Sequence, residues 1–159
     1  MRERLQHLET EFTPLSLYCH ERFISDLYQS AINRFLDHPH VGILRNLQIR
    51  HFERILKLVA TEFRGQVSVL KNISPPSSLL LEAGEIEGDF DLSEFLLYVS
   101  KIEKLLLNKY RFLANNADLD HSFSSPIASQ LVPFQSANIA ILDRLLATTR
   151  HLENDLDTN

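Results

Sequence analysis

Two glutamates and one histidine stand at positions where the apolar pattern of this sequence calls for core residues. Glu21 is followed seven residues later by Tyr28, and Glu103 is followed at the same spacing by Tyr110. His51 interrupts a third apolar stripe in the same way. Burying a carboxylate costs several kcal/mol unless the charge is paired, hydrogen-bonded or bound to a metal ion. The residues therefore predict a polar layer in the core, suited to metal binding or to a hydrogen-bonded network.

Polar pairs three residues apart complete this pattern. Gln48 pairs with His51 in the second apolar stripe, and Gln135 pairs with Asn138 in the fourth. The two halves of the chain thus repeat one order of interruptions, a glutamate with a tyrosine and then a polar pair. We expect these side chains to form one layer across the middle of a helical bundle: Glu21, Gln48, His51, Glu103, Gln135 and Asn138.

Four long segments with helical spacing of apolar residues must position this layer. They cover approximately residues 14–36, 39–64, 91–115 and 125–153. Pro14 suits the first position of a helix, and Asp91 with Glu94 has the form of a capping box. Pro133 falls inside the fourth segment, where it either kinks the helix or marks its start.

The lengths of the connections predict how the helices pair. A tight turn at 37–39 and a short polar loop at 115–125 favour antiparallel neighbours, whereas residues 65–90 form a long crossover. The sequence therefore predicts an all-α fold in one domain over residues 1–159. Two antiparallel helix hairpins are joined by the crossover, and a polar C-terminal tail follows at 154–159.

The composition argues against several classes of protein. The chain has 16 Lys and Arg against 21 Asp and Glu, and a net charge of −5 disfavours binding to nucleic acid or to an anionic membrane. The sequence contains no stretch of about 18 apolar residues, which is the length needed to span a bilayer. Four glycines are few for a Rossmann or P-loop fold. A single cysteine, Cys19, and a charged start without an apolar leader fit a cytoplasmic protein.

A stripe of basic residues follows one side of the second segment. Its members are Arg50, Arg54, Lys57 and Arg64. We expect this stripe on the solvated outer face of the helix. The alternative is that the acidic run from Glu82 to Asp91 folds back over it.

With these residues and this arrangement, the chain resembles the ferritin-like and rubrerythrin-like four-helix bundles. That family places one glutamate on each of two helices and Glu-x-x-His on the other two. Glu21 and Glu103 match the single-glutamate positions. The remaining family positions are occupied here by Gln48, His51, Gln135 and Asn138. The chain is most similar to small bacterial members of unknown function with a degenerate di-iron site.

The departures from the family pattern change the expected chemistry. A full site offers four carboxylates and two imidazoles, whereas this chain keeps two carboxylates and one imidazole at those positions. Amides are neutral and weak ligands for transition metals. We therefore expect a hydrogen-bonded layer without a cofactor. The alternative is a single iron or manganese ion held by Glu21, Glu103 and His51.

The aromatic residues suggest how such a bundle would act. Phe23, Phe52, Phe63 and Phe95 lie off the inward stripes, and exposed aromatic residues are typical of partner surfaces. We expect a non-catalytic bundle that acts by homo- or hetero-association, with a homodimer as the leading form. The alternative function is a rubrerythrin-like, metal-dependent oxidoreductase or oxidative-stress protein with a reduced carboxylate–histidine site.

Overall fold

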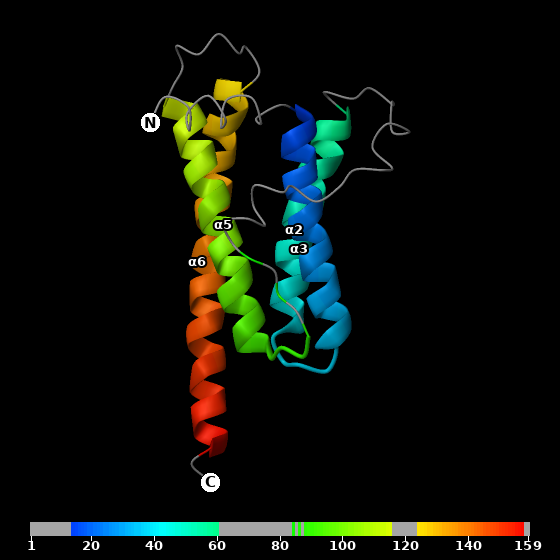
Figure 1. Ribbon diagram of the computed structural model, residues 1–159, viewed down its shortest axis with the longest axis vertical. Coiled ribbons are helices and arrows are strands. Elements are labelled where there is room, and N and C mark those ends of the chain that lie inside the picture. The colour runs from blue at the N-terminus through cyan, green and yellow to red at the C-terminus, as the bar shows by residue number, and fades with distance from the viewer. Residues whose placement is uncertain (1–13, 61–83, 85, 87, 116–123, 158–159) are drawn as a thin grey trace.

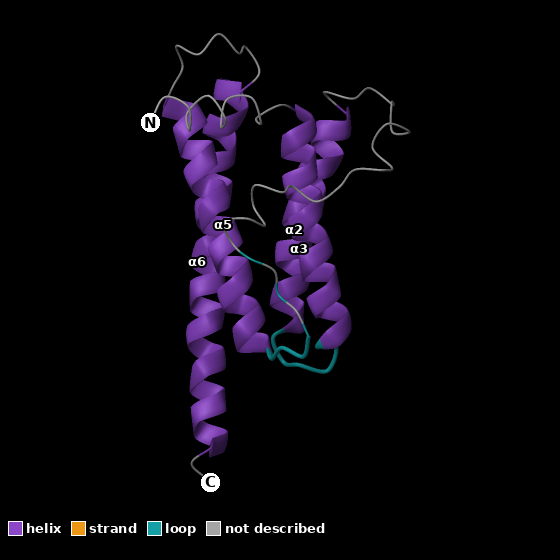
Figure 2. Cartoon of the chain, viewed as in Figure 1, coloured by secondary structure: helices purple, strands orange, loops and turns teal. Residues whose placement is uncertain are grey.

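The computed structural model describes residues 14–60, 84, 86, 88–115 and 124–157, and all regular structure in these ranges is helical (Figures 1 and 2). The helices are α2 (Pro14–Arg34), α3 (Val41–Leu58), α5 (Leu92–Asn115) and α6 (Ser124–Asp157). The prediction of an all-α fold with four long helices is confirmed. None of these helices is long and apolar enough to cross a membrane.

The helices lie side by side in two pairs, α2 with α3 and α5 with α6, and the main backbone contact between the pairs is that of α2 with α5. In Figure 1, α2 runs downward and α3 returns beside it after a turn at residues 35–40. On the other side, α5 runs upward and α6 runs downward beside it. Helices α2 and α5 are therefore antiparallel, which fixes how their polar residues meet.

Local signals set the start of α5 as the sequence predicts. The backbone N–H of Glu94 donates to Asp91 Oδ1 at 2.7 Å, and the backbone N–H of Asp91 donates to Glu94 Oε2 at 2.9 Å. These reciprocal bonds form the capping box, which satisfies two backbone donors at the start of the helix. Just before it, Gly88 has a φ of 74°, a conformation that favours glycine.

Two boundaries of α6 differ from the prediction. The helix begins at Ser124, so Pro133 lies inside it and does not mark its start. It also continues to Asp157, four residues beyond the end predicted at about residue 153. The chain has neither glycine nor proline after Pro133 to stop the helix, and Figure 1 shows its C-terminal end running past the other helices. Most of the expected crossover, residues 65–83, lies outside the described residues.

The core fills the space between the four helices and includes one aromatic ring that was expected at the surface. Phe95 is buried, and its ring meets that of Tyr28 edge-on with the centroids 6.1 Å apart. The prediction for Phe95 is wrong because the apolar face of α5 is wider than the single stripe used to predict it. Phe23 is partly buried against the same core, and Phe63 lies outside the described residues.

Candidate functional site

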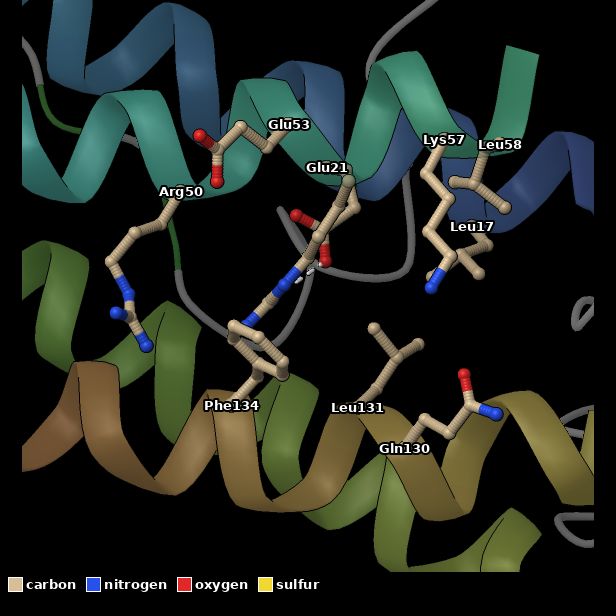
Figure 3. A pocket seen from close by; sticks show the side chains of 10 residues that line it. Leu17, Glu21, Arg50, Glu53, Lys57, Leu58, Gln130, Leu131 and Phe134 are labelled. Atoms are coloured by element: carbon tan, nitrogen blue, oxygen red, sulfur yellow. Dashed lines mark hydrogen bonds and ion pairs between the residues drawn. The ribbon is translucent and has the colours of Figure 1, made fainter. Parts of the chain in front are cut away.

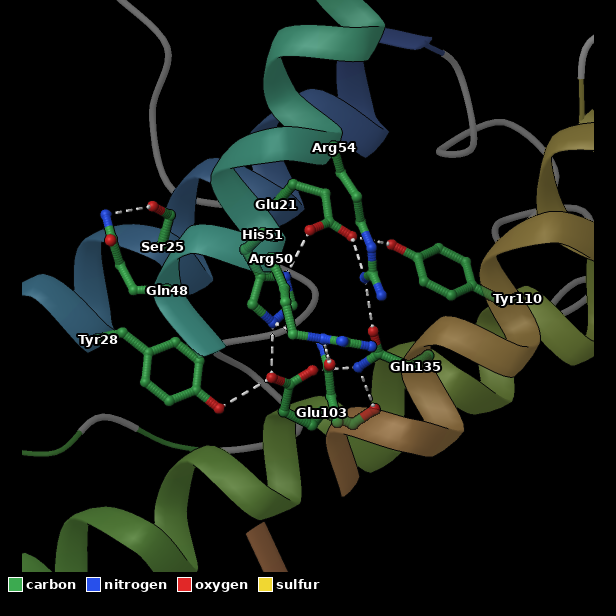
Figure 4. Close-up of polar contacts among 11 residues, drawn as sticks. Glu21, Ser25, Tyr28, Gln48, Arg50, His51, Arg54, Glu103, Tyr110 and Gln135 are labelled. Carbon is green, nitrogen blue, oxygen red and sulfur yellow. Dashed lines mark hydrogen bonds and ion pairs between the residues drawn. The ribbon is translucent and has the colours of Figure 1, made fainter. Parts of the chain in front are cut away.

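The predicted polar layer forms at the centre of the bundle (Figure 4). Five of its expected members are fully buried, and together they come from all four helices: Glu21, His51, Glu103, Gln135 and Asn138. The structure does not bring Gln48 into this layer. Gln48 is half-buried, and its Nε2 lies 3.4 Å from the Oγ of Ser25 at the side of the network.

His51 bridges the two buried carboxylates. Its Nδ1 lies 2.5 Å from Glu21 Oε2, and its Nε2 lies 2.7 Å from Glu103 Oε1. Only the protonated ring can donate from both nitrogens. Burial alone would lower the pKa of His51, but the charges of Glu103 and Glu21 raise it to about 9. At neutral pH, His51 is therefore a cation at the centre of the bundle.

Arg54 supplies a second buried cation, and the prediction that it lies on a solvated outer face is wrong. Its side chain is only 9% exposed. Its Nη1 donates to Glu21 Oε1 at 3.1 Å and to Gln135 Oε1 at 2.9 Å. The polar pair that α3 contributes is therefore His51 with Arg54. The carboxylate of Glu21 compensates the charge of the buried Arg54, and the amide oxygen of Gln135 accepts a further hydrogen bond.

The sequence contains a signal for this placement of Arg54. An inward stripe on α3 with strictly alternating steps of three and four is Leu44, Leu47, His51, Arg54 and Leu58. All five of these side chains are buried in the structure. A stripe with the same steps that passes through Gln48 and Ile55 does not include Arg54 and predicts that Arg54 lies on the outer face. The two readings differ by less than one-third of a helical turn, so apolar spacing alone does not separate them.

Each tyrosine of the repeated pattern bonds to the carboxylate of the opposite half. The Tyr28 hydroxyl donates to Glu103 Oε1 at 3.0 Å, and the Tyr110 hydroxyl donates to Glu21 Oε1 at 2.7 Å. Because α2 and α5 are antiparallel and both spacings are seven residues, a single register satisfies both pairs. Burial and the nearby carboxylates raise the pKa of both tyrosines well above the usual value, so both remain donors.

Gln135 connects the fourth helix to this network. Its side-chain nitrogen donates to the main-chain carbonyl of Glu103 at 3.0 Å and to Glu103 Oε2, while its oxygen accepts from Arg54.

Burial alone would raise the pKa of Glu21, but Arg54 and His51 lower it to about 2. The layer thus pairs the carboxylates of Glu21 and Glu103 with the cations His51 and Arg54.

Asn138 occupies the last predicted position of the layer. Its Oδ1 accepts from Arg50 Nε at 2.6 Å, and its Nδ2 lies 3.3 Å from His51 Nε2. Asn138 is therefore hydrogen-bonded to a partly exposed arginine on α3 and lies in contact with the buried histidine, whose protonated Nε2 has no lone pair to accept from Nδ2. Like Gln135, Asn138 takes part in the layer through hydrogen bonds of its neutral side-chain amide.

This arrangement does not fit a ferritin-type metal centre. Both nitrogens of His51 are directed at carboxylate oxygens, and the guanidinium of Arg54 already neutralises charge at Glu21. A guanidinium stays protonated in proteins and has no lone pair to offer a metal. Within residues 14–60, 84, 86, 88–115 and 124–157, no cluster of three or more His, Cys, Asp and Glu side chains is arranged to hold a metal ion.

No family model, curated protein or solved structure matches this chain.

Proposed function

We propose that this chain is a metal-independent, cytoplasmic bundle of ferritin-like ancestry that acts by association and not by catalysis. The ancestry is supported by the positions of Glu21 and Glu103 on two antiparallel helices, with a polar pair on each of the other two. The directions of the helices also fit two antiparallel hairpins joined by a crossover. The internal cations His51 and Arg54 take over the charge compensation that metal ions provide in that family.

An exposed apolar ridge on α3 carries the proposal of association. Its members are Ile49, Phe52 and Leu56, with exposed fractions of 48%, 46% and 54%. Their spacing of three and four residues places them on one face, directed away from the core. Contiguous apolar surface of this kind is typical of protein–protein contacts. We propose a second copy of the chain as the leading partner, with another protein as the alternative.

Substitution of Phe52 tests this proposal. Sedimentation equilibrium of the wild-type protein should show a monomer–dimer equilibrium, and Phe52→Glu should raise the dimer dissociation constant by about tenfold or more, since a charge is then buried at the contact. Leu97→Glu is the matched control, because Leu97 is also 46% exposed but lies on α5. A wild-type protein that stays monomeric at all concentrations, or equal weakening by both variants, would contradict self-association.

A metal titration tests the alternative of a reduced carboxylate–histidine site. Iron(II) or manganese(II) added to the purified protein should not bind stoichiometrically, because the metal would have to displace the bonds of His51 to both carboxylates. Glu103→Ala should change stability and leave metal content unaffected. One metal ion per chain in the wild-type protein, lost in Glu103→Ala, would overturn the metal-independent proposal.

A further inference from the structure

A groove of about 450 Å³ opens between α3 and α6 beside the polar layer (Figure 3). Apolar side chains from three helices form much of its wall: Leu17, Leu58, Leu131 and Phe134. Its volume lies within the range of small-molecule sites, which are mostly apolar with a few placed polar groups. The groove lies on the side of α3 that faces α6, away from the apolar ridge.

Beside this groove, Arg54 has a buried polar edge that makes no hydrogen bond to the described residues. It lines the groove, and its Nη1 is taken by Glu21 and Gln135. Its Nε and Nη2 are buried and have no hydrogen-bond partner among the described residues. These two nitrogens lie on the same edge of the planar guanidinium, and their parallel N–H bonds match the two oxygens of a carboxylate. Leaving such donors buried and unpaired is costly.

The charges around the groove favour one monovalent anion. Its lining holds three basic side chains against two carboxylates: Arg50, Arg54, Lys57, Glu21 and Glu53. The excess of one positive charge suits a carboxylate better than a dianionic phosphate ester. A neutral apolar molecule would fit the wall but would leave the Arg54 edge unpaired.

We propose that the groove binds a small amphipathic monocarboxylate, such as a medium-chain fatty acid. The carboxylate accepts two hydrogen bonds from Nε and Nη2 of Arg54, and the hydrocarbon lies against Leu131 and Leu58. The ring of Phe134, which is 53% exposed and lies 5.5 Å from Cζ of Arg54, covers the guanidinium and turns aside when the ligand enters. This inference is independent of association through α3.

Titration with decanoate, below its critical micelle concentration, tests the site. Isothermal titration calorimetry should give one decanoate per chain. The dissociation constants of decanol, which lacks the charge, and of acetate, which lacks the hydrocarbon, should be at least about tenfold higher. Equal affinities for decanoate and decanol would overturn the proposal, because binding would then need no guanidinium.

Two variants separate the guanidinium from the apolar wall. Arg54→Lys keeps the charge but removes the paired donors, and it should weaken decanoate binding by about tenfold or more. Leu131→Asp places a carboxylate in the groove and should weaken binding to a similar extent without altering the polar layer. Leu152→Asp, near the far end of α6, is the matched control and should bind as the wild type does. Wild-type affinity in both groove variants would overturn the proposal.

Amide chemical shifts of the wild-type protein provide a test that needs no variant. Decanoate should shift the signals of the residues that line the groove, including Arg50, Glu53, Arg54 and Lys57 on α3 and Gln130, Leu131 and Phe134 on α6. Shifts centred on the ridge at Ile49, Phe52 and Leu56 would show a different apolar site and overturn the proposal. Because the groove and the ridge are separate, Phe52→Glu should leave decanoate affinity unchanged.

Discussion

Replacing His51 with alanine is expected to lower the free energy of unfolding by about 3–5 kcal/mol, the usual cost of removing one partner from a buried ion pair. His51 donates to both Glu21 and Glu103, and all three side chains are fully buried. Its loss leaves a layer with two carboxylates and only the Arg54 cation. Urea unfolding near pH 6 measures the effect, with exposed His151→Ala as a control expected to change stability by less than about 0.5 kcal/mol.

A double variant identifies charge imbalance as the cause of this loss. Glu103→Gln removes the negative charge that His51 neutralises, so His51→Ala with Glu103→Gln leaves Glu21 paired with Arg54. The double variant should be more stable than the sum of the two single losses implies, by about 1–3 kcal/mol. Additive losses, or a loss below about 1 kcal/mol in His51→Ala alone, would show that the layer does not depend on this charge pairing.

The stability of the protein is expected to be greatest between about pH 4.5 and 6.5 and to fall on both sides of this range. The pKa of His51 is raised from 6.5 to about 9, so its contribution is complete below about pH 6.5 and is lost as the pH rises through 9. The pKa of Glu21 is lowered from 4.5 to about 2, so its contribution is complete above about pH 4.5 and is lost as the pH falls through 2. Each shift corresponds to about 3 kcal/mol.

Urea unfolding at a series of pH values measures this profile. Between pH 6 and pH 9.5 the wild-type protein should lose about 3 kcal/mol, because neutral His51 can donate to only one of its two carboxylates. His51→Ala should not show this alkaline loss, although it is less stable throughout. A wild-type stability that stays constant from pH 6 to pH 9.5 would mean that His51 is not held as a cation.

The sequence carries enough information to predict the helices and most of the polar layer. The capping box at Asp91 and the apolar spacing each act locally, so they can be recognised without knowledge of the neighbouring helices. The matched spacings of Glu21 with Tyr28 and of Glu103 with Tyr110 indicate a buried layer, because a buried carboxylate needs a partner. These predictions depend on one helix at a time.

The features that could not be predicted depend on how the helices pack. Arg54 and Gln48 lie at opposite edges of the inward stripe of α3, and only the position of α6 decides which edge is covered. Phe95 likewise lies at the edge of the stripe of α5, where contact with Tyr28 buries it. The long stem of arginine adds to the difficulty, because it carries a charge from the edge of a helix into the core.

The crossed bonds between the tyrosines and glutamates also determine which alignment of α2 and α5 the chain can adopt. Aliphatic side chains repeat along both helices, so a slip of seven residues would still place apolar residues against apolar residues. In one direction that slip would bring Glu21 opposite Glu103, two buried carboxylates facing each other and separated from their tyrosine donors. An all-aliphatic layer would remove this penalty, and such replacements are often neutral or stabilising in energy. The buried charges therefore select one alignment of the helices over its slipped alternative, whatever they add to the total stability.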